Sequence, residues 1–175
     1  MTKFNRFLTD FYKTNDIIRA FHILKGKNSV NKNDTIKAIE KFVSSQEMTM
    51  FRLKKGIYGD AMKNLDQVFT PYKEFAEFFK NPANRLQELL GNIAYESILN
   101  YTEAGLSHCE KIHSIYFVES KGFFKSGLKY IEPDATARER AKSYYDKLLE
   151  NNEKLNEYID IGLQRLHGLE AKVFE

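Results

Sequence analysis

Three residues near the middle of this 175-residue chain have the types and the spacing of metal ligands. Glu110 and His113 stand three residues apart, the spacing by which ferritin-like bundles place two di-iron ligands on one helical face. Cys109 lies four residues before His113, so a thiol and an imidazole could also meet at one metal ion. A di-iron site needs a second Glu-x-x-His pair and structural zinc needs four ligands, and the rest of the sequence completes neither set.

We therefore interpret Glu110 and His113 as a chance pairing and Cys109 as a small apolar core residue, and we keep a metal-binding ferritin-like bundle as an alternative. The sequence also contains no glycine-rich phosphate loop and no convincing Ser/His/Asp set. We predict that the protein is not an enzyme and that it uses no cofactor and no metal.

A second group of residues has the chemistry of an anion-binding surface. Three lysines recur every four residues, which in a helix aligns them on one face, and three more cations follow a predicted turn. The six are Lys121, Lys125, Lys129, Arg138, Arg140 and Lys142. Such a basic tip could contact lipid phosphates, with Phe123-Phe124 as an adjacent apolar wedge. The alternative is a solvated helix end whose cations complement the helix dipole.

The N-terminal region is a candidate docking element. Residues 1–32 carry seven basic and two acidic side chains, and a helix predicted over 2–25 has one apolar face. That face consists of Phe4, Phe7, Leu8, Phe11, Ile18 and Phe21. Basic amphipathic helices bind membrane surfaces or grooves of partner proteins, although this face could equally pack on the rest of the chain. We predict a helix and connector over 1–32 and a separate bundle over 33–175.

The elements that must position these residues are long helices. With only three prolines and nine glycines, the composition favours an all-α fold. Apolar side chains spaced by three and four predict a helix over 34–80, which Pro71 kinks or divides. Asn81-Pro82 should end it, because the residue before proline avoids the helical region. A further helix should then run from residue 82 to near Ile131.

The last helix has the most regular pattern. It should start at Asp134, or at the Thr136-x-x-Glu139 capping box, and end near Val173. Its apolar seam alternates steps of four and three, which is a heptad pattern. The seam is Ala141, Tyr145, Leu148, Asn152, Leu155, Ile159, Gly162, Leu166, Leu169 and Val173. Asn152 is either a buried amide that specifies register or a residue at an exposed stretch.

Short connections make consecutive helices antiparallel, so we predict an elongated antiparallel three-helix coiled-coil bundle with an extra N-terminal amphipathic helix. A rod of this kind has much surface for its interior, and the chain has 24 Phe and Tyr residues. We therefore expect a homodimer. The start of the chain lacks the apolar stretch of a signal peptide, and no run approaches the roughly 18 apolar residues of a membrane span. We expect a cytoplasmic protein that can be peripheral on a membrane.

This layout of a basic amphipathic N-terminal helix, three long helices and a basic tip resembles the BAR (Bin/amphiphysin/Rvs) class of membrane-curvature modules. The resemblance covers residues 34–173 and implies a crescent homodimer that touches anionic lipid through the six cations of the tip. The leading expectation is a non-catalytic, dimeric scaffold on anionic membranes. The alternative is an adaptor that binds another protein's helix through the Phe4-to-Phe21 face. Nucleic acid is not an expected partner, because the net charge is only +3 and no reading motif is present.

Overall fold

The structure is a computed structural model that describes residues 32–121 and 126–174. It is mostly helical, as predicted, with one two-stranded sheet among the described residues. The predicted N-terminal helix lies outside this part of the chain. In chain order the elements are α3 (Lys32–Tyr58), α4 (Thr70–Lys80), α5 (Leu86–Leu90), α6 (Asn92–Tyr116), β1 (Phe117–Lys121), β2 (Ser126–Tyr130) and α7 (Ala135–Phe174).

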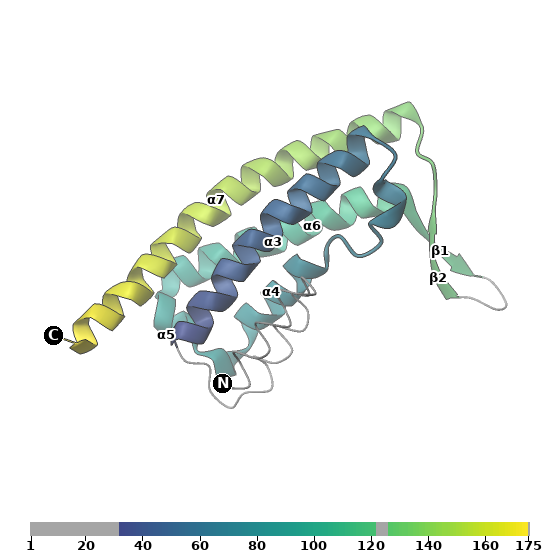
Figure 1. The fold of residues 1–175 in the computed structure, drawn as a ribbon. Coiled ribbons are helices and arrows are strands. Elements are labelled where there is room, and N and C mark those ends of the chain that lie inside the picture. The colour runs from purple at the N-terminus through teal and green to yellow at the C-terminus, as the bar shows by residue number, and fades with distance from the viewer. Residues whose placement is uncertain (1–31, 122–125, 175) are drawn as a thin grey trace.

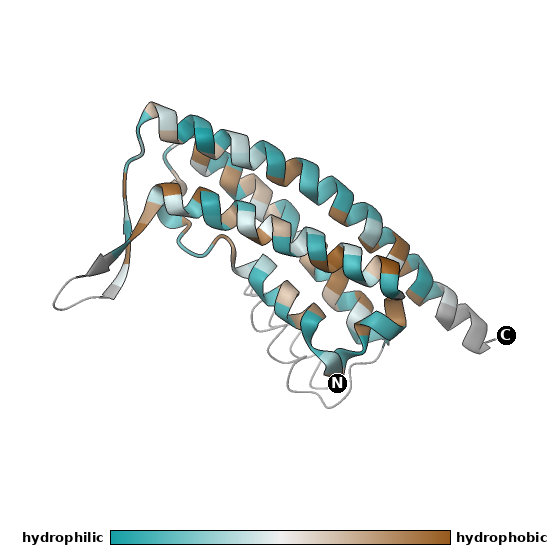
Figure 2. Ribbon diagram, turned by 180° about the vertical axis from the view of Figure 1, so that it is seen from behind, coloured by the Kyte–Doolittle hydropathy of each residue, from teal (hydrophilic) through white to brown (hydrophobic). Residues whose placement is uncertain are grey.

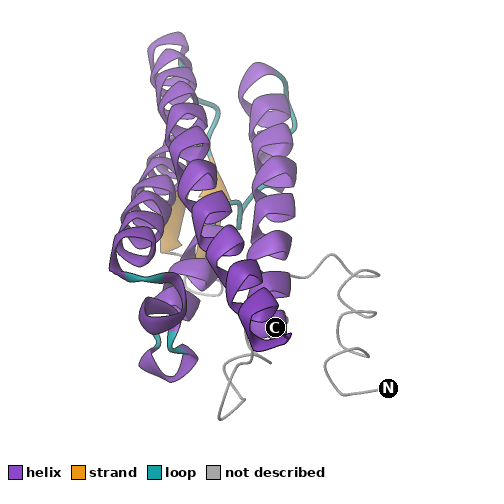
Figure 3. Cartoon of the chain, turned by 90° about the vertical axis from the view of Figure 1, so that its left-hand side faces the viewer, coloured by secondary structure: helices purple, strands orange, loops and turns teal. Residues whose placement is uncertain are grey.

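The helices α3, α4, α6 and α7 each pack against two of the others, and consecutive ones run in opposite directions (Figure 1). The α3 and α7 helices adjoin where α3 ends and α7 begins, since the Tyr58 and Tyr145 ring centroids are 6.5 Å apart. The end of α4 meets the start of α6 through stacked Phe79 and Tyr95, with 6.1 Å between ring centroids. Seen along the bundle, the strands lie at the far end, behind the helices (Figure 3).

The helix predicted over 34–80 is divided, which is one of the two outcomes predicted for Pro71, but the prediction is wrong between Tyr58 and Thr70, where the chain turns back. Gly56 permits this turn, since a Cβ there would lie 2.6 Å from the Met62 sulfur and 3.1 Å from its Cα. Met62 itself is completely buried, so the turn belongs to the core. Pro71 lies in the first turn of α4, where its missing N–H costs no helical hydrogen bond, and it therefore begins a new helix.

The predicted break at Asn81-Pro82 is confirmed. The Asn81 side-chain oxygen accepts a hydrogen bond of 3.1 Å from the Ala83 N–H at the start of a single 3-10 turn. Arg85 then adopts φ 54° and Gly91 φ 82°, both in the left-handed region, on either side of the short α5. Two changes of direction in ten residues bring α6 back along α4.

The predicted end of the following helix near Ile131 is also wrong. The α6 helix stops at Tyr116, and the chain continues as an antiparallel hairpin in which Phe117 pairs with Tyr130 and Val118 with Lys129. Aromatic and β-branched side chains favour strands, and the base of the hairpin is buried. The Phe117 ring stacks on His113, with 4.6 Å between ring centroids, and contacts Tyr130 edge-on at 5.7 Å.

The seam of α7 is confirmed over its described side chains. Every predicted position from Ala141 to Leu166 is buried, whereas the side chains of Leu169 and Val173 lie outside the description. Asp134 caps the helix, because its side-chain oxygen accepts a hydrogen bond of 2.7 Å from the Ala137 N–H. The remaining surface of α7 is largely hydrophilic (Figure 2). This apolar seam packs α7 against α6 and α3.

Candidate functional site

The six cations of the predicted basic tip are not on one helical face. Lys121 ends β1, Lys129 is an exposed residue of β2, and Lys125 lies outside the described residues. Lys121 and Lys129 lie on different strands, so the four-residue spacing that would align them on one face of a helix does not apply to them. The other three cations, Arg138, Arg140 and Lys142, lie in the first turns of α7 at the same end of the bundle.

Two of these cations have carboxylate partners. Arg138 forms an ion pair with Glu132, and Lys142 Nζ lies 2.9 Å from Glu139 Oε1. The Lys142 ammonium also stands 5.1 Å from the centroid of the Tyr58 ring. Solvent-exposed pairs of this kind neutralise charge but contribute little stability. The positive charge of the tip is therefore smaller than the sequence pattern suggests.

The hairpin carries apolar side chains that the sequence analysis missed. The exposed fractions of Val118, Leu128 and Ile131 are 41%, 49% and 40%, and Lys129 pairs directly with Val118. Directly paired residues share a face of the ribbon, so an apolar side chain and a cation stand together. The aromatic and β-branched residues Phe117, Val118, Tyr130 and Ile131 were the available signal, but the helical spacing of the lysines concealed it.

His113 is a structural residue. Its Nε2 lies 2.7 Å from the backbone oxygen of Asp66, an arrangement in which the neutral ring donates. Burial lowers the pKa of His113, which keeps the imidazole neutral, against opposing effects of Asp66. Glu110 is exposed on the surface of α6, so the two residues do not form a pair of ligands. Across residues 32–121 and 126–174, no three His, Cys, Asp or Glu side chains gather as a metal site.

The prediction that Cys109 belongs to the core is confirmed. Its side chain is completely buried, and burial raises the pKa of the thiol far above its usual range. A buried neutral thiol is a poor nucleophile and a poor metal ligand. Cys109 therefore acts as a small apolar residue that packs between the helices.

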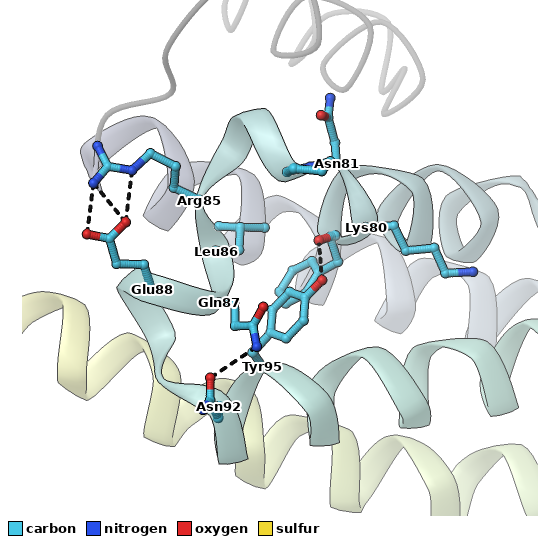
Figure 4. A pocket seen from close by; sticks show the side chains of 10 residues that line it. Lys80, Asn81, Arg85, Leu86, Gln87, Glu88, Asn92 and Tyr95 are labelled. Atoms are coloured by element: carbon cyan, nitrogen blue, oxygen red, sulfur yellow. Dashed lines mark hydrogen bonds and ion pairs between the residues drawn. The ribbon is translucent and has the colours of Figure 1, made fainter.

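A cavity of about 560 Å³ lies where α4, α5 and α6 meet (Figure 4). Its polar side chains satisfy one another: Arg85 Nη2 is 2.7 Å from Glu88 Oε2, and Gln87 Nε2 donates to Asn92 Oδ1 at 3.1 Å. The Tyr95 hydroxyl donates to the backbone oxygen of Phe79 at 3.0 Å. These contacts hold the connection between helices together and leave no charged group of this set aimed at a ligand.

A second surface missed in the sequence lies on α3. Met48, Phe51 and Tyr58 are 42%, 57% and 57% exposed, and an open hollow of about 480 Å³ is lined by Phe51, Tyr58 and the lysines between them. Their spacing of three and seven residues defines a second stripe, nearly opposite the buried Leu53. That spacing was visible in the sequence, but the stronger buried seam obscured it.

The predicted docking face from Phe4 to Phe21 lies outside the described residues. No helix among those that the structure describes has the length and apolar character to cross a membrane. No protein-family model matches this chain, and no curated protein and no solved structure matches it. The likeness to BAR modules therefore stays a hypothesis.

Proposed function

We propose that this protein is a non-catalytic helical scaffold that binds an anionic membrane surface, peripherally, through the hairpin end of its bundle. One observation carries the proposal: the hairpin projects from the end of the helices and exposes Val118 beside Lys129 on one face, Leu128 on the other face and Ile131 just after β2 (Figure 1). Apolar side chains next to cations suit the boundary between lipid headgroups and acyl chains.

Charge and apolar area must act together here. The tip has six cations and, close by in sequence, four carboxylates (Glu119, Glu132, Asp134 and Glu139). A net excess of two charges contributes about 2 kcal/mol at an anionic surface, at about 1 kcal/mol per cation. Burial of three apolar side chains at about 25 cal/mol per Å² adds an attraction of similar size. Binding should therefore be weak, salt-sensitive and dependent on the hairpin.

Co-sedimentation with vesicles tests the proposal. The full chain should sediment with phosphatidylserine-containing vesicles at low salt, less at high salt, and not with neutral phosphatidylcholine vesicles. Leu128→Glu should remove most of the binding. Ile93→Glu is the matched control, because Ile93 is 78% exposed but lies at the start of α6, the end away from the hairpin.

Absence of sedimentation at low salt would refute the membrane proposal. If Leu128→Glu and Ile93→Glu lost vesicle binding to the same extent, the hairpin would not be the membrane-binding element. Circular dichroism of both variants should give the helical signal of the wild type, which separates a loss of binding from a loss of folding.

A further inference from the structure

The exposed stripe on α3 adjoins a second stripe of opposite charge on α7. Five acidic residues recur at steps of four and three along α7, and all five are exposed: Asp146, Glu150, Glu153, Glu157 and Asp160. They extend over about 21 Å, at 1.5 Å per residue. Within the described chain, none of the five forms an ion pair.

The basic side chains of the facing surface belong to α3. Lys54 and Lys55 lie between Phe51 and Tyr58, and neither lysine has an ion-pair partner in the part of the chain that the structure describes. Lys55 stands 5.0 Å from the Phe51 ring centroid. Over residues 47–58 the only carboxylate is Glu47. The α3 stripe is therefore aromatic and basic, whereas the α7 stripe is acidic.

The two stripes lie on the same side of the bundle. The Tyr58 ring in the α3 stripe contacts both Tyr145 and Lys142 of α7, and Lys142 is one turn before Asp146. Of the two lysines within the α7 stretch, Lys147 lies toward α6, since it contacts the Tyr144 ring, which Lys111 of α6 also contacts. The acidic stripe is thus next to α3 on one continuous surface.

The heights of the two stripes also correspond. Because α3 and α7 are antiparallel and Tyr58 adjoins Tyr145, each step back along α3 matches one step forward along α7. Residues 54 and 55 are then level with residues 148 and 149. Leu149 is 40% exposed and lies between Asp146 and Glu150, level with the hollow lined by Phe51 and Tyr58.

We infer that a second copy of this chain docks on the α3–α7 surface, related by a two-fold axis parallel to the helices. Such an axis keeps heights unchanged and places α3 of each copy over α7 of the other. Leu149 of one copy then enters the Phe51–Tyr58 hollow of the other, and Lys54 and Lys55 face Asp146 and Glu150. A two-fold axis perpendicular to the helices would instead place α3 of one copy against α3 of the other, and α7 against α7. The basic stripes would then face each other, and so would the acidic stripes.

This arrangement has a consequence at the hairpin end. Rotation about an axis parallel to the helices leaves both hairpins at the same end of the dimer. Two weak contacts would then act on one surface, which raises their combined affinity. The inference itself rests on the α3 and α7 stripes alone, so it does not depend on the proposed membrane contact.

Size-exclusion chromatography with light scattering tests the inference on the full chain. Wild-type protein should have twice the 20.5 kDa mass of one chain. Leu149→Glu should raise the dissociation constant about tenfold or more, because it inserts a charge into the hollow and adds to the acidic stripe. Ile93→Glu is the matched control: Ile93 is also an exposed aliphatic residue, at 78%, but it belongs to α6 and to neither stripe.

A charge exchange identifies the pairing. Lys54→Glu with Lys55→Glu should give monomers, and so should Asp146→Lys with Glu150→Lys. A mixture of the two double variants should form heterodimers. A monomeric wild type, equal effects of Leu149→Glu and Ile93→Glu, or a mixture of folded double variants that stays monomeric would each overturn the inference. None of these measurements involves lipid, so failure of the membrane proposal would not affect them.

Discussion

The Tyr72 hydroxyl in α4 and the Asn152 carboxamide in α7 satisfy each other in the centre of the bundle. The Tyr72 Oη donates to Asn152 Oδ1 at 3.1 Å, and Asn152 Nδ2 donates to Tyr72 Oη at 2.8 Å. Tyr72 is completely buried and Asn152 is 7% exposed, and burial raises the pKa of the Tyr72 hydroxyl, so it stays protonated. Two residues 80 positions apart thus fix how α4 meets α7.

Removal of one partner should cost more than removal of both. Tyr72→Phe leaves the Asn152 amide buried without this partner, and Asn152→Leu does the same to the Tyr72 hydroxyl, so each should lower the unfolding free energy by about 1–3 kcal/mol. The double variant should lose less than the sum of the two single losses. Urea denaturation of the four proteins measures the difference. Additive losses would show that the two groups are energetically independent.

Gly105 should not tolerate a side chain. A Cβ there would lie 2.7 Å from Tyr72 Cε1, and Tyr72 cannot move because its ring is fully buried. Gly105→Ala should therefore lower the unfolding free energy by about 1–3 kcal/mol, although alanine is the better helix former. Gly168 in α7 has nothing within 4 Å of the same position, so Gly168→Ala should instead stabilise by up to about 1 kcal/mol. Thermal unfolding of both variants tests the contrast, and a stabilised Gly105 variant would contradict it.

Asp134 should be the working cap of α7. Its carboxylate accepts from the Ala137 N–H at 2.7 Å, so Asp134→Ala should cost about 1 kcal/mol of unfolding free energy. Thr136 was the other candidate, but its side chain is exposed and one turn of helix already precedes Glu139. Thr136→Ala should be nearly neutral. Chemical denaturation compares the two, and a larger loss at Thr136 would reverse the assignment.

Stability should fall in mild acid because of His113. Burial lowers its pKa in the folded state, so the unfolded chain takes up the proton first as pH falls below about 6.5. The stabilising contribution is therefore present above about pH 6.5 and is lost as pH falls toward the lower pKa of the folded protein. Burial also lowers the pKa of His108, which adds in the same direction.

Unfolding measured from about pH 7.5 to about pH 5.5 should show this decline. His113→Gln keeps a donor near the Asp66 carbonyl but does not titrate, so it should flatten the profile. Adding His108→Gln should flatten it further. An unchanged slope in the double variant would show that other groups govern the acid response.

Much of α7 was predictable because a single heptad pattern extends along the whole helix and no proline or turn motif interrupts it. Its heptad seam, its start at Asp134 and its end close to residue 173 all follow from local chemistry, and burial from Ala141 to Leu166 agrees. The same reasoning failed between Tyr58 and Thr70. Met62 and Val68 are buried there in a turn folded back on α3, and apolar residues in such a turn can copy helical spacing.

The candidate site shows the same limit. Helical spacing of lysines predicted a basic stripe, yet Lys121 and Lys129 lie on two strands of a hairpin. The hairpin forms where Phe117 and Tyr130 pack with Tyr116 and His113, and the contacts with Tyr130 exist only if the chain reverses direction after β1. The residue types of the α3 and α7 stripes can be read from the sequence. That the two stripes lie on the same side of the bundle and at the same level along it cannot.

By itself, the sequence determined that the chain is mostly helical, where α7 runs, that Asn81-Pro82 breaks the chain and that Cys109 is a core residue. These features depend on periodicity, capping and proline geometry, which act within a few turns. Only the tertiary structure decided that α4 is a separate helix, that β1 and β2 replace the end of α6, and that the α3 and α7 stripes adjoin. Those outcomes depend on which distant side chains bury one another, and neighbouring residues alone do not specify that choice.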